Sequence, residues 1–285
     1  MLTIAQMQHF KDAGISGIIE EVGKAFPLVT RTNTVEVKGN IINIPVIVND
    51  IPGEFRDPYA GKSNSGYTSE TRPVSLSFCD CSWHVDEMVV KSDPVGIDGC
   101  TSRAASSAIR GAMKALENAA FHGASGFAGL DQSISSDNVI DAGGSGNTTD
   151  AYIVNDSAVS LFVAGGSLFE AGEIQKLPTS DKYGKIYWSY QQNLSWYAAL
   201  CAVAKTGIAK VENISTDNKL NDDLIFEAMS RLDPSYPPTA IYMSTTGVRH
   251  LQITRTGTSL TGAPAPIPVD VSGVPVYVSS AIQVL

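Results

Sequence analysis

The chain has 285 residues, of which 17% are charged, and its formal net charge is −9. This length allows one elaborate domain or two, with a substantial buried core. The negative charge argues against a protein that grips nucleic acid through its overall field, because neutralising phosphates requires clustered Lys and Arg. The four cysteines are spread through a chain too large to need a disulfide framework, so we expect reduced thiols.

Neither a signal peptide nor a membrane span is predicted. The first 24 residues mix charged and polar side chains among the apolar ones and contain no uninterrupted signal-peptide core. The most apolar window, Trp196–Ala204, is about half as long as the ~20 residues that a membrane-spanning helix requires. We therefore expect no membrane partner.

The N-terminal region predicts a short helix and then a hairpin. Apolar residues recur at helical spacing from Ile15 to Val22, and Phe26-Pro27 follows, which closes an amphipathic helix. Two alternating runs, Val35–Val37 and Ile42–Val48, flank a Gly-Asn turn. This pattern predicts a β-hairpin.

Residues 49–72 contain several Gly and Pro residues and no periodic apolar pattern. A compact domain rarely carries more than about 12 to 15 residues of such loop unless the loop is functional or disordered. The apolar alternation changes phase between Phe78 and Cys79, which predicts a bulge or burial of both faces. We interpret residues 46–90 as a long two-stranded arm. Because isolated two-stranded ribbons are marginal in water, the arm needs a neighbour to lie on.

A long helix is predicted from Asp98 to His122, because apolar and small residues form one stripe and Gly123 stands at the C-cap position. At 1.5 Å per residue it would be roughly 35 Å long. A second domain is expected to begin near Ser125 and to mix strands with two short helices. Its expected elements are strands at 152–154, 159–163, 186–190, 239–243 and 274–278, a helix at 224–232 after Asn221-Asp222, and a helix capped by Ser244.

Three stretches in this order resemble the major capsid protein of tailed bacteriophages, of the Hong Kong 97 type. Residues 112–123, before Gly129-Leu130, are similar to the end of that family's spine helix. Residues 240–251 are similar to a strand and helix of its axial domain, and 273–282 to its closing strand. Residues 188–214 resemble a subgroup seen mainly in short-tailed phages, although the usual Asp-Trp-Arg run is missing.

The resemblance implies an α+β capsid fold with an N-terminal arm, an extended loop, a peripheral domain with a long spine helix, and an axial domain. The expected boundaries are 1–34 for the arm, 35–90 for the hairpin and extended loop, 91–124 for the spine helix of the peripheral domain, 125–272 for the axial domain, and 273–285 for the closing strand.

The resemblance also implies a structural protein and not an enzyme. Copies would assemble into hexamers and pentamers of an icosahedral head that encloses double-stranded DNA without sequence-specific binding, in the virion and assembled in the host bacterial cytoplasm. The chain has no long charged N-terminal segment of the kind that serves as a fused scaffold, so a separate scaffolding protein is expected. A portal protein at one vertex and a decoration or cement protein are further implied partners, and no cofactor is implied.

On the extended loop we expect Arg56, Tyr59, Lys62 and Tyr67 to touch a neighbouring subunit; the alternative is a solvated, mobile tip. Some relatives join a loop lysine to an asparagine of another subunit by an isopeptide bond, and Lys62 is the only lysine in this loop tip. The sequence identifies no acceptor for such a bond.

Other motifs have weaker functional interpretations. Cys79, Cys81 and His84 offer zinc ligands, but structural zinc takes four. Gly61-Lys62-Ser63 imitates a phosphate-binding loop without its first glycine or its helix. His84-Val85-Asp86 suggests a small serine/histidine hydrolase, but residues two apart share a strand face by geometry alone, and no Gly-x-Ser-x-Gly elbow exists. We therefore expect no metal and no catalytic residues. The nearest alternative is an encapsulin-like bacterial compartment shell, and the hydrolase is the second.

Overall fold

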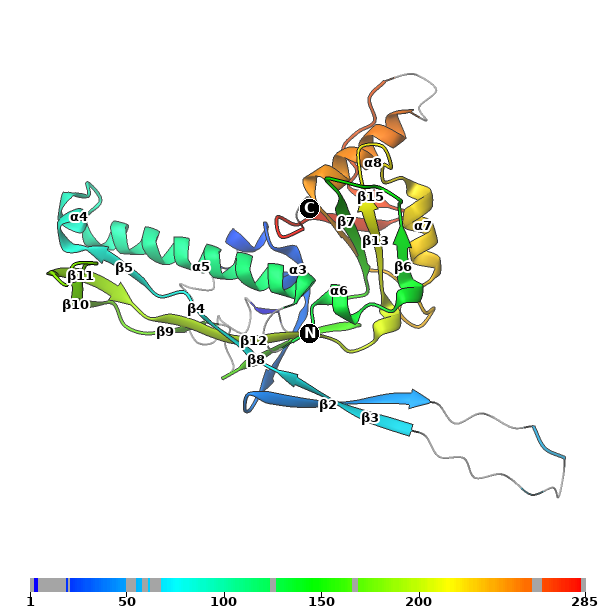
Figure 1. The fold of residues 1–285 in the computed structure, drawn as a ribbon, viewed down its shortest axis with the longest axis horizontal. Coiled ribbons are helices and arrows are strands. Elements are labelled where there is room, and N and C mark those ends of the chain that lie inside the picture. Colours follow the sequence, from blue (N-terminus) through cyan, green and yellow to red (C-terminus); the bar gives the residue numbers. More distant parts are fainter. Residues whose placement is uncertain are drawn as a thin grey trace.

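The computed structural model describes residues 3–4, 19, 21–49, 55–57, 61, 68–123, 127–165, 169–257 and 263–282. Figure 1 shows three parts: a long helix, α5, with sheets along it, a rounded body of sheet and helices at its C-terminal end, and a ribbon that projects from the junction. The described residues contain no helix that is both long and apolar enough to cross a membrane.

The spine helix α5 (Gly96–His122) confirms the predicted long helix and begins two residues earlier than expected. Its buried stripe includes Ile109, Met113 and Leu116. Gly123 ends the helix with φ of 90°, a left-handed value that favours glycine. At the other end, α4 (Glu87–Ser92) precedes α5, and the Asp86 carboxylate caps α4 by accepting from Met88 N.

Two sheets lie along the spine helix. The first has the order β1-β8-β12-β4, with β9 also paired to β12, and the second has the order β10-β11-β5. The strands of the first are β1 (Asn33–Val37), β4 (Ser77–Asp80), β8 (Val159–Ala164), β9 (Phe169–Ala171) and β12 (Leu194–Ala202). Those of the second are β5 (Trp83–Asp86), β10 (Gln175–Ser180) and β11 (Ile186–Gln192). Residues 159–202, which we expected inside the axial domain, thus contribute to the sheets beside α5.

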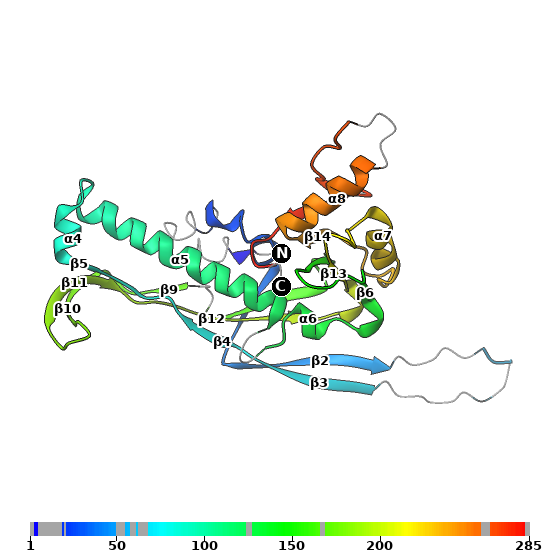
Figure 2. The same cartoon turned by 45° about the horizontal axis from the view of Figure 1, so that its top comes forward.

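The projecting ribbon consists of β2 (Ile41–Asn49) and β3 (Thr68–Ser75), paired antiparallel from Ile41 opposite Ser75 to Asn49 opposite Thr68. Figures 1 and 2 show it pointing away from the rest of the molecule. The predicted hairpin of 35–48 is wrong, because β1 pairs in parallel with β8 inside the body and only β2 enters the ribbon.

The arm expected over 46–90 is shorter than predicted and ends at Ser75. Breaks at Leu76 and at Cys81-Ser82 divide the following residues into β4 and β5, which pair with β12 and β11 of the body. The phase change predicted between Phe78 and Cys79 lies inside β4, where the pairing with β12 is regular and has no bulge. The chain exchanges its pairing partners before and after this strand, at the two breaks.

The body at the C-terminal end of α5 contains a six-stranded sheet of order β15-β16-β14-β7-β13-β6. Every residue of the central strand β7 (Thr149–Val154) is buried. The other strands are β6 (Val139–Asp141), β13 (Ile208–Ile214), β14 (Ala240–Met243), β15 (Asp270–Val271) and β16 (Val274–Val278). The helices α7 (Asp222–Ser230) and α8 (Thr245–Gly257) confirm the two predicted ones, with caps from Asn221 and Ser244.

The N-terminal segment packs against the spine helix. Residues 21–23 are helical and Ile19 and Val22 are buried, while Ile15 and Ile18 lie outside the described residues. Pro27 opens a further short helix, α3 (Pro27–Arg31), at the position where a proline is well tolerated. The segment therefore belongs to the hydrophobic core that lies along the buried face of α5.

Candidate functional site

The ribbon is the first candidate for an interaction surface, because it leaves apolar side chains in solvent. Ile41 at its root is 61% exposed, and Phe55 beyond the end of β2 is fully exposed at 108%. A free two-stranded ribbon has unpaired backbone groups on both outer edges, which is unfavourable unless another chain covers them. The ribbon therefore has the properties of a surface that acts between molecules.

Of the four predicted contact residues, the structure describes only Arg56, which is exposed. Tyr59, Lys62 and Tyr67 lie outside the described residues, so their contact with a neighbour stays a prediction. Phe55 was not among the contact residues predicted from the sequence. The signal that was present is a lone aromatic residue next to charged Glu54, Arg56 and Asp57.

A cleft of about 190 Å³ lies at the root of the ribbon, between β3, β12 and the segment before α6 (Leu130–Ser133). Its apolar lining includes Ile44, Val74, Phe127 and Leu200. Arg72 and Lys205 also line it, and within the described part of the chain neither forms a salt bridge. The cleft thus combines an apolar lining with two cations.

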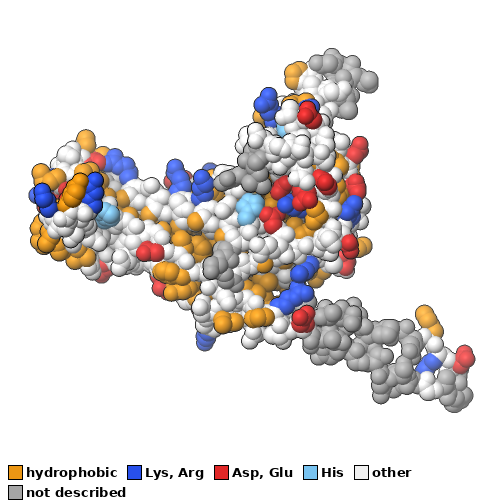
Figure 3. Space-filling model, in the orientation of Figure 1, with side chains coloured by type: hydrophobic (Ala, Val, Ile, Leu, Met, Phe, Trp, Pro, Cys, Tyr) orange, Lys and Arg blue, Asp and Glu red, His pale blue; other side chains and the backbone are white. Residues whose placement is uncertain are grey.

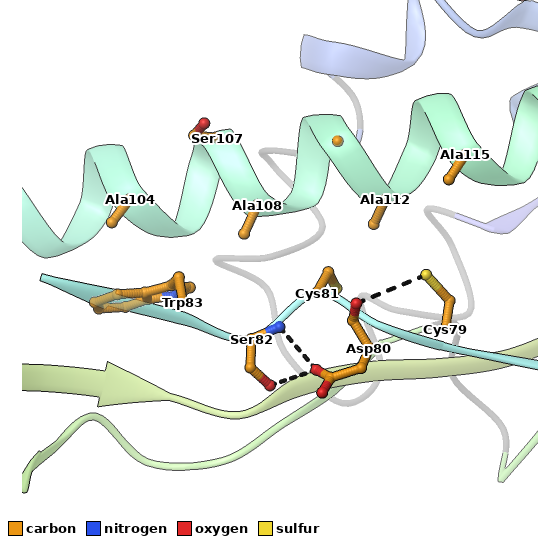
Figure 4. Close-up of a pocket in the computed structure, with 11 residues that line it drawn as sticks. Cys79, Asp80, Cys81, Ser82, Trp83, Ala104, Ser107, Ala108, Ala112 and Ala115 are labelled. Carbon is orange, nitrogen blue, oxygen red and sulfur yellow. Dashed lines mark hydrogen bonds between the residues drawn. The ribbon is translucent and has the colours of Figure 1, made fainter. Parts of the chain in front are cut away.

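A larger cleft, of about 510 Å³, separates α5 from the β4–β5 strand segment (Figure 4). The helix contributes small side chains, among them Ala104, Ala108 and Ala112, and the strand contributes residues 79–83. The Asp80 carboxylate accepts from the backbone N and hydroxyl of Ser82, at 2.9 and 2.6 Å. This carboxylate is thus engaged within its own strand.

The proposed zinc ligands gain no support from this geometry. Burial raises the pKa of the Cys79 thiol and, more strongly, that of Cys81 to about 12, which disfavours the thiolates that zinc requires. The Cys81 thiol donates to Leu194 O at 3.3 Å, and His84 is exposed. The described residues contain no group of three or more His, Cys, Asp or Glu side chains that could hold a metal.

The His84-Val85-Asp86 motif does not assemble a triad either. The Asp86 carboxylate accepts from Met88 N at 2.7 Å and serves as the cap of α4. His122, at the end of α5, pairs with Asp131 at 2.6 Å, but Asp131 is bound in turn by Lys210 and by the Tyr152 hydroxyl. These groups form a structural network at the junction of α5 with the six-stranded sheet.

The junction network shifts the titration of its members. Burial alone would raise the pKa of Asp131, but hydrogen bonds from His122, Tyr152 and Lys210 outweigh it and lower the pKa to about 2. The hydrogen bond to Asp131 raises the pKa of His122. Lys210 also contacts Asp150 at 2.9 Å, so one buried ammonium ties α6 to β7 and β13.

A second buried carboxylate, Glu117 near the C-terminal end of α5, joins three distant segments. It accepts from Leu28 N at 3.3 Å and Val29 N at 2.9 Å, and from the Ser279 hydroxyl at 2.8 Å. The N-terminus of α3 has no capping side chain of its own, so Glu117 takes that role from another helix. Burial raises the pKa of Glu117 to about 7 despite these donors.

The far end of the spine carries a further apolar surface. Figure 3 shows hydrophobic side chains gathered there among lysines and arginines. The exposed large side chains are Met88 and Val89 of α4, Val95 and Ile97 at the start of α5, and Ile186 and Trp188 of β11. An exposed cluster of this kind marks an interaction site in a soluble protein.

Comparison with solved structures identifies the fold. The chain matches a chain in the structure of bacteriophage Epsilon15 with a TM-score of 0.62 and 14% identity, covering 88% of this chain and 87% of the other. It matches a chain of the bacteriophage JBD30 capsid with a TM-score of 0.56 and 11% identity, covering 88% of each. No protein-family model and no curated protein sequence matches the chain. The chain therefore has the mixed helix and sheet fold of Hong Kong 97-type phage capsid proteins, which confirms the predicted fold class.

Proposed function

We propose that this protein is the major capsid protein of a tailed bacteriophage. Its copies associate into hexamers and pentamers, which close into an icosahedral head around double-stranded DNA. The fold supports this proposal, since both matched chains come from phage particles. The function is mechanical: heterologous contacts between identical chains close around symmetry axes.

The observation that carries the proposal is the uncovered ribbon. Its length, its free edges and the fully exposed Phe55 leave surface that the chain's own body does not cover. Contacts with other copies satisfy such surface. Because every subunit makes several contacts at once, each contact can be weak while the shell is stable.

In finer detail, Arg56, Tyr59, Lys62 and Tyr67 contact a neighbouring subunit in this proposal. A separate scaffolding protein and a portal protein at one vertex are its further partners, with a decoration or cement protein as an optional one. Within the family, the chain belongs to the subgroup seen mainly in short-tailed phages. Assembly takes place in the host bacterial cytoplasm, and the product is the virion.

The division into domains follows the same proposal, with two revisions. The arm, spine helix, axial domain and closing strand keep their expected limits, but residues 159–202 belong to the peripheral domain because they form the sheets beside α5. The extended loop is reduced to the ribbon of residues 41–75, because β1, β4 and β5 also pair in those sheets. No catalytic residue, metal or cofactor forms part of the proposed function. The structural roles of Asp86 and Asp131 support this, because both carboxylates are engaged in holding the fold.

Expression of the full chain with and without the neighbouring phage genes, followed by sedimentation and negative-stain electron microscopy, tests the proposal. Closed, uniform particles are the expected product, and efficient closure by the chain alone would argue against a separate scaffold. Particles that contain protein cargo and no DNA from an infected host would indicate an encapsulin-like compartment instead. A chain that never sediments as an assembly under any of these conditions would refute the proposal.

A further inference from the structure

Phe55 is an aromatic side chain with no cover from its own molecule. It is fully exposed, and the next two residues, Arg56 and Asp57, are also exposed, with Asp57 two positions from the ring. Solvating a whole aromatic side chain is unfavourable, since a Phe buries 150 to 250 Å² when it finds a site. An apolar ring with a carboxylate close by is therefore presented at the far end of the ribbon.

The cleft at the ribbon root has the complementary composition. Ile44, Val74, Phe127 and Leu200 give it an apolar lining, Arg72 and Lys205 add two cations, and none of the described residues that line it is a carboxylate. Its volume of about 190 Å³ suits one aromatic ring, given that an apolar cavity of about 150 Å³ takes up benzene. The ligand chemistry that it fits is thus an aromatic side chain beside an acid.

The chain's own Phe55 is held away from this cleft. Ile44 at the root and Phe55 are 11 residues apart, which allows a separation of up to roughly 36 Å. The ladder from Ile41 opposite Ser75 to Asn49 opposite Thr68 keeps the ribbon extended. Phe55 lies beyond the end of that ladder and is fully exposed, so its ring does not fill the cleft of its own chain and is accessible to the cleft of a second copy.

We infer that Phe55 of one copy occupies the cleft at the ribbon root of the next copy, with Asp57 facing Arg72 and Lys205. The inference rests on the proposed function and names the partner surface for the ribbon. The contact is heterologous, because the Phe55 side chain and the cleft are different parts of the same chain. Repeated head to tail with a rotation of one fifth or one sixth of a turn, it closes into the ring of a pentamer or hexamer.

A native cysteine makes the inference testable by crosslinking. Cys201 lines the cleft, so Phe55→Cys places a second thiol against it in the neighbouring subunit. Burial raises the pKa of Cys201, and oxidation is therefore carried out with copper phenanthroline at mildly alkaline pH. Assembled particles of the variant are expected to give a ladder of covalent multimers on a non-reducing denaturing gel, which a reductant collapses to monomer.

Two controls fix the pairing. In the first control, Cys201→Ser is added to the Phe55→Cys chain, and the ladder of multimers is expected to disappear. In the second control, Phe78→Cys places the new thiol on β4, at a Phe that is 55% exposed and outside the cleft. This variant is expected to form no crosslink to Cys201. Particles of Phe55→Cys that stay monomeric on the gel, or a ladder that persists without Cys201, would overturn the inference while leaving shell formation intact. Failure of the wild-type chain to form particles would instead count against the proposed function.

Charge exchange provides a second test that does not depend on the thiols. Asp57→Lys is expected to raise the protein concentration needed for assembly about tenfold, and Lys205→Asp alone to act in the same direction. The double variant restores the pair and recovers most of the loss, in the manner of a double-mutant cycle. Strictly additive losses in the double variant would contradict the inference, and this test also decides it if Phe55→Cys alone abolishes assembly.

Discussion

Replacing Glu117 by glutamine is expected to remove most of the pH dependence of stability between about pH 4.5 and 7. The pKa of Glu117 rises from 4.5 to about 7 because the carboxyl is buried. The folded chain thus holds a proton that the unfolded chain releases, so the free energy of unfolding is highest below pH 4.5 and falls as the pH rises through 7. At ~1.4 kcal/mol for each unit of pKa difference, the wild-type loss is about 3 kcal/mol.

The free energy of unfolding is measured by urea unfolding of the unassembled chain, followed by tryptophan fluorescence. The measurement is repeated from about pH 4 to pH 8, because this range spans the ordinary and the raised pKa of Glu117. Glu117→Gln keeps an oxygen that accepts from Val29 N and has no charge to bury, so its profile should be flatter than the wild-type profile by about 3 kcal/mol. Glu173→Gln, at an exposed position, is the matched control and should follow the wild type. Parallel profiles for the wild type and the Glu117→Gln variant would refute the reasoning.

Two further substitutions test the junction. Gly129→Ala is expected to destabilise the chain by about 3 kcal/mol or more, because its Cβ would lie 2.6 Å from Phe121 O and 2.8 Å from His122 C. Gly111→Ala is the matched control: its Cβ would meet nothing within 4 Å, so it should stabilise α5 by about 0.5 to 1 kcal/mol. Equal shifts of the melting temperature for the two variants would contradict this reasoning. Asp131→Asn should lower the free energy of unfolding by about 2 kcal/mol at neutral pH, since the pKa of Asp131 falls from 3.8 to about 2 on folding. That difference should shrink as the pH falls below 3.8 and through 2, and a difference that stays constant in acid would show that the carboxylate charge is not its cause.

The spine helix and the helices of the C-terminal body could be predicted because their signals are local. The apolar stripe before Gly123 fixes the face and the end of α5, and the caps Asn221 and Ser244 fix the starts of α7 and α8. Each of these signals lies within a few turns of the helix that it defines, so no knowledge of distant segments is needed.

The strand pairings could not be predicted in the same way. β1 and β2 alternate like the two sides of a hairpin, but β1 pairs in parallel with β8, which is more than 100 residues away in the sequence. The pattern of alternating residues records only which face is buried and does not identify the partner strand. The cleft at the ribbon root was missed for a similar reason, since Arg72, Phe127 and Lys205 come from three separate segments.

The central claim is that the ribbon of residues 41–75 is covered by other copies of the same chain. Electron cryomicroscopy of purified particles, at a resolution that traces the backbone, tests it most directly. The account predicts closed icosahedral shells in which each β2–β3 ribbon lies on the adjacent subunit and reaches the root of that subunit's ribbon. A monomer that forms no particles, with the ribbon packed on its own body, would contradict it.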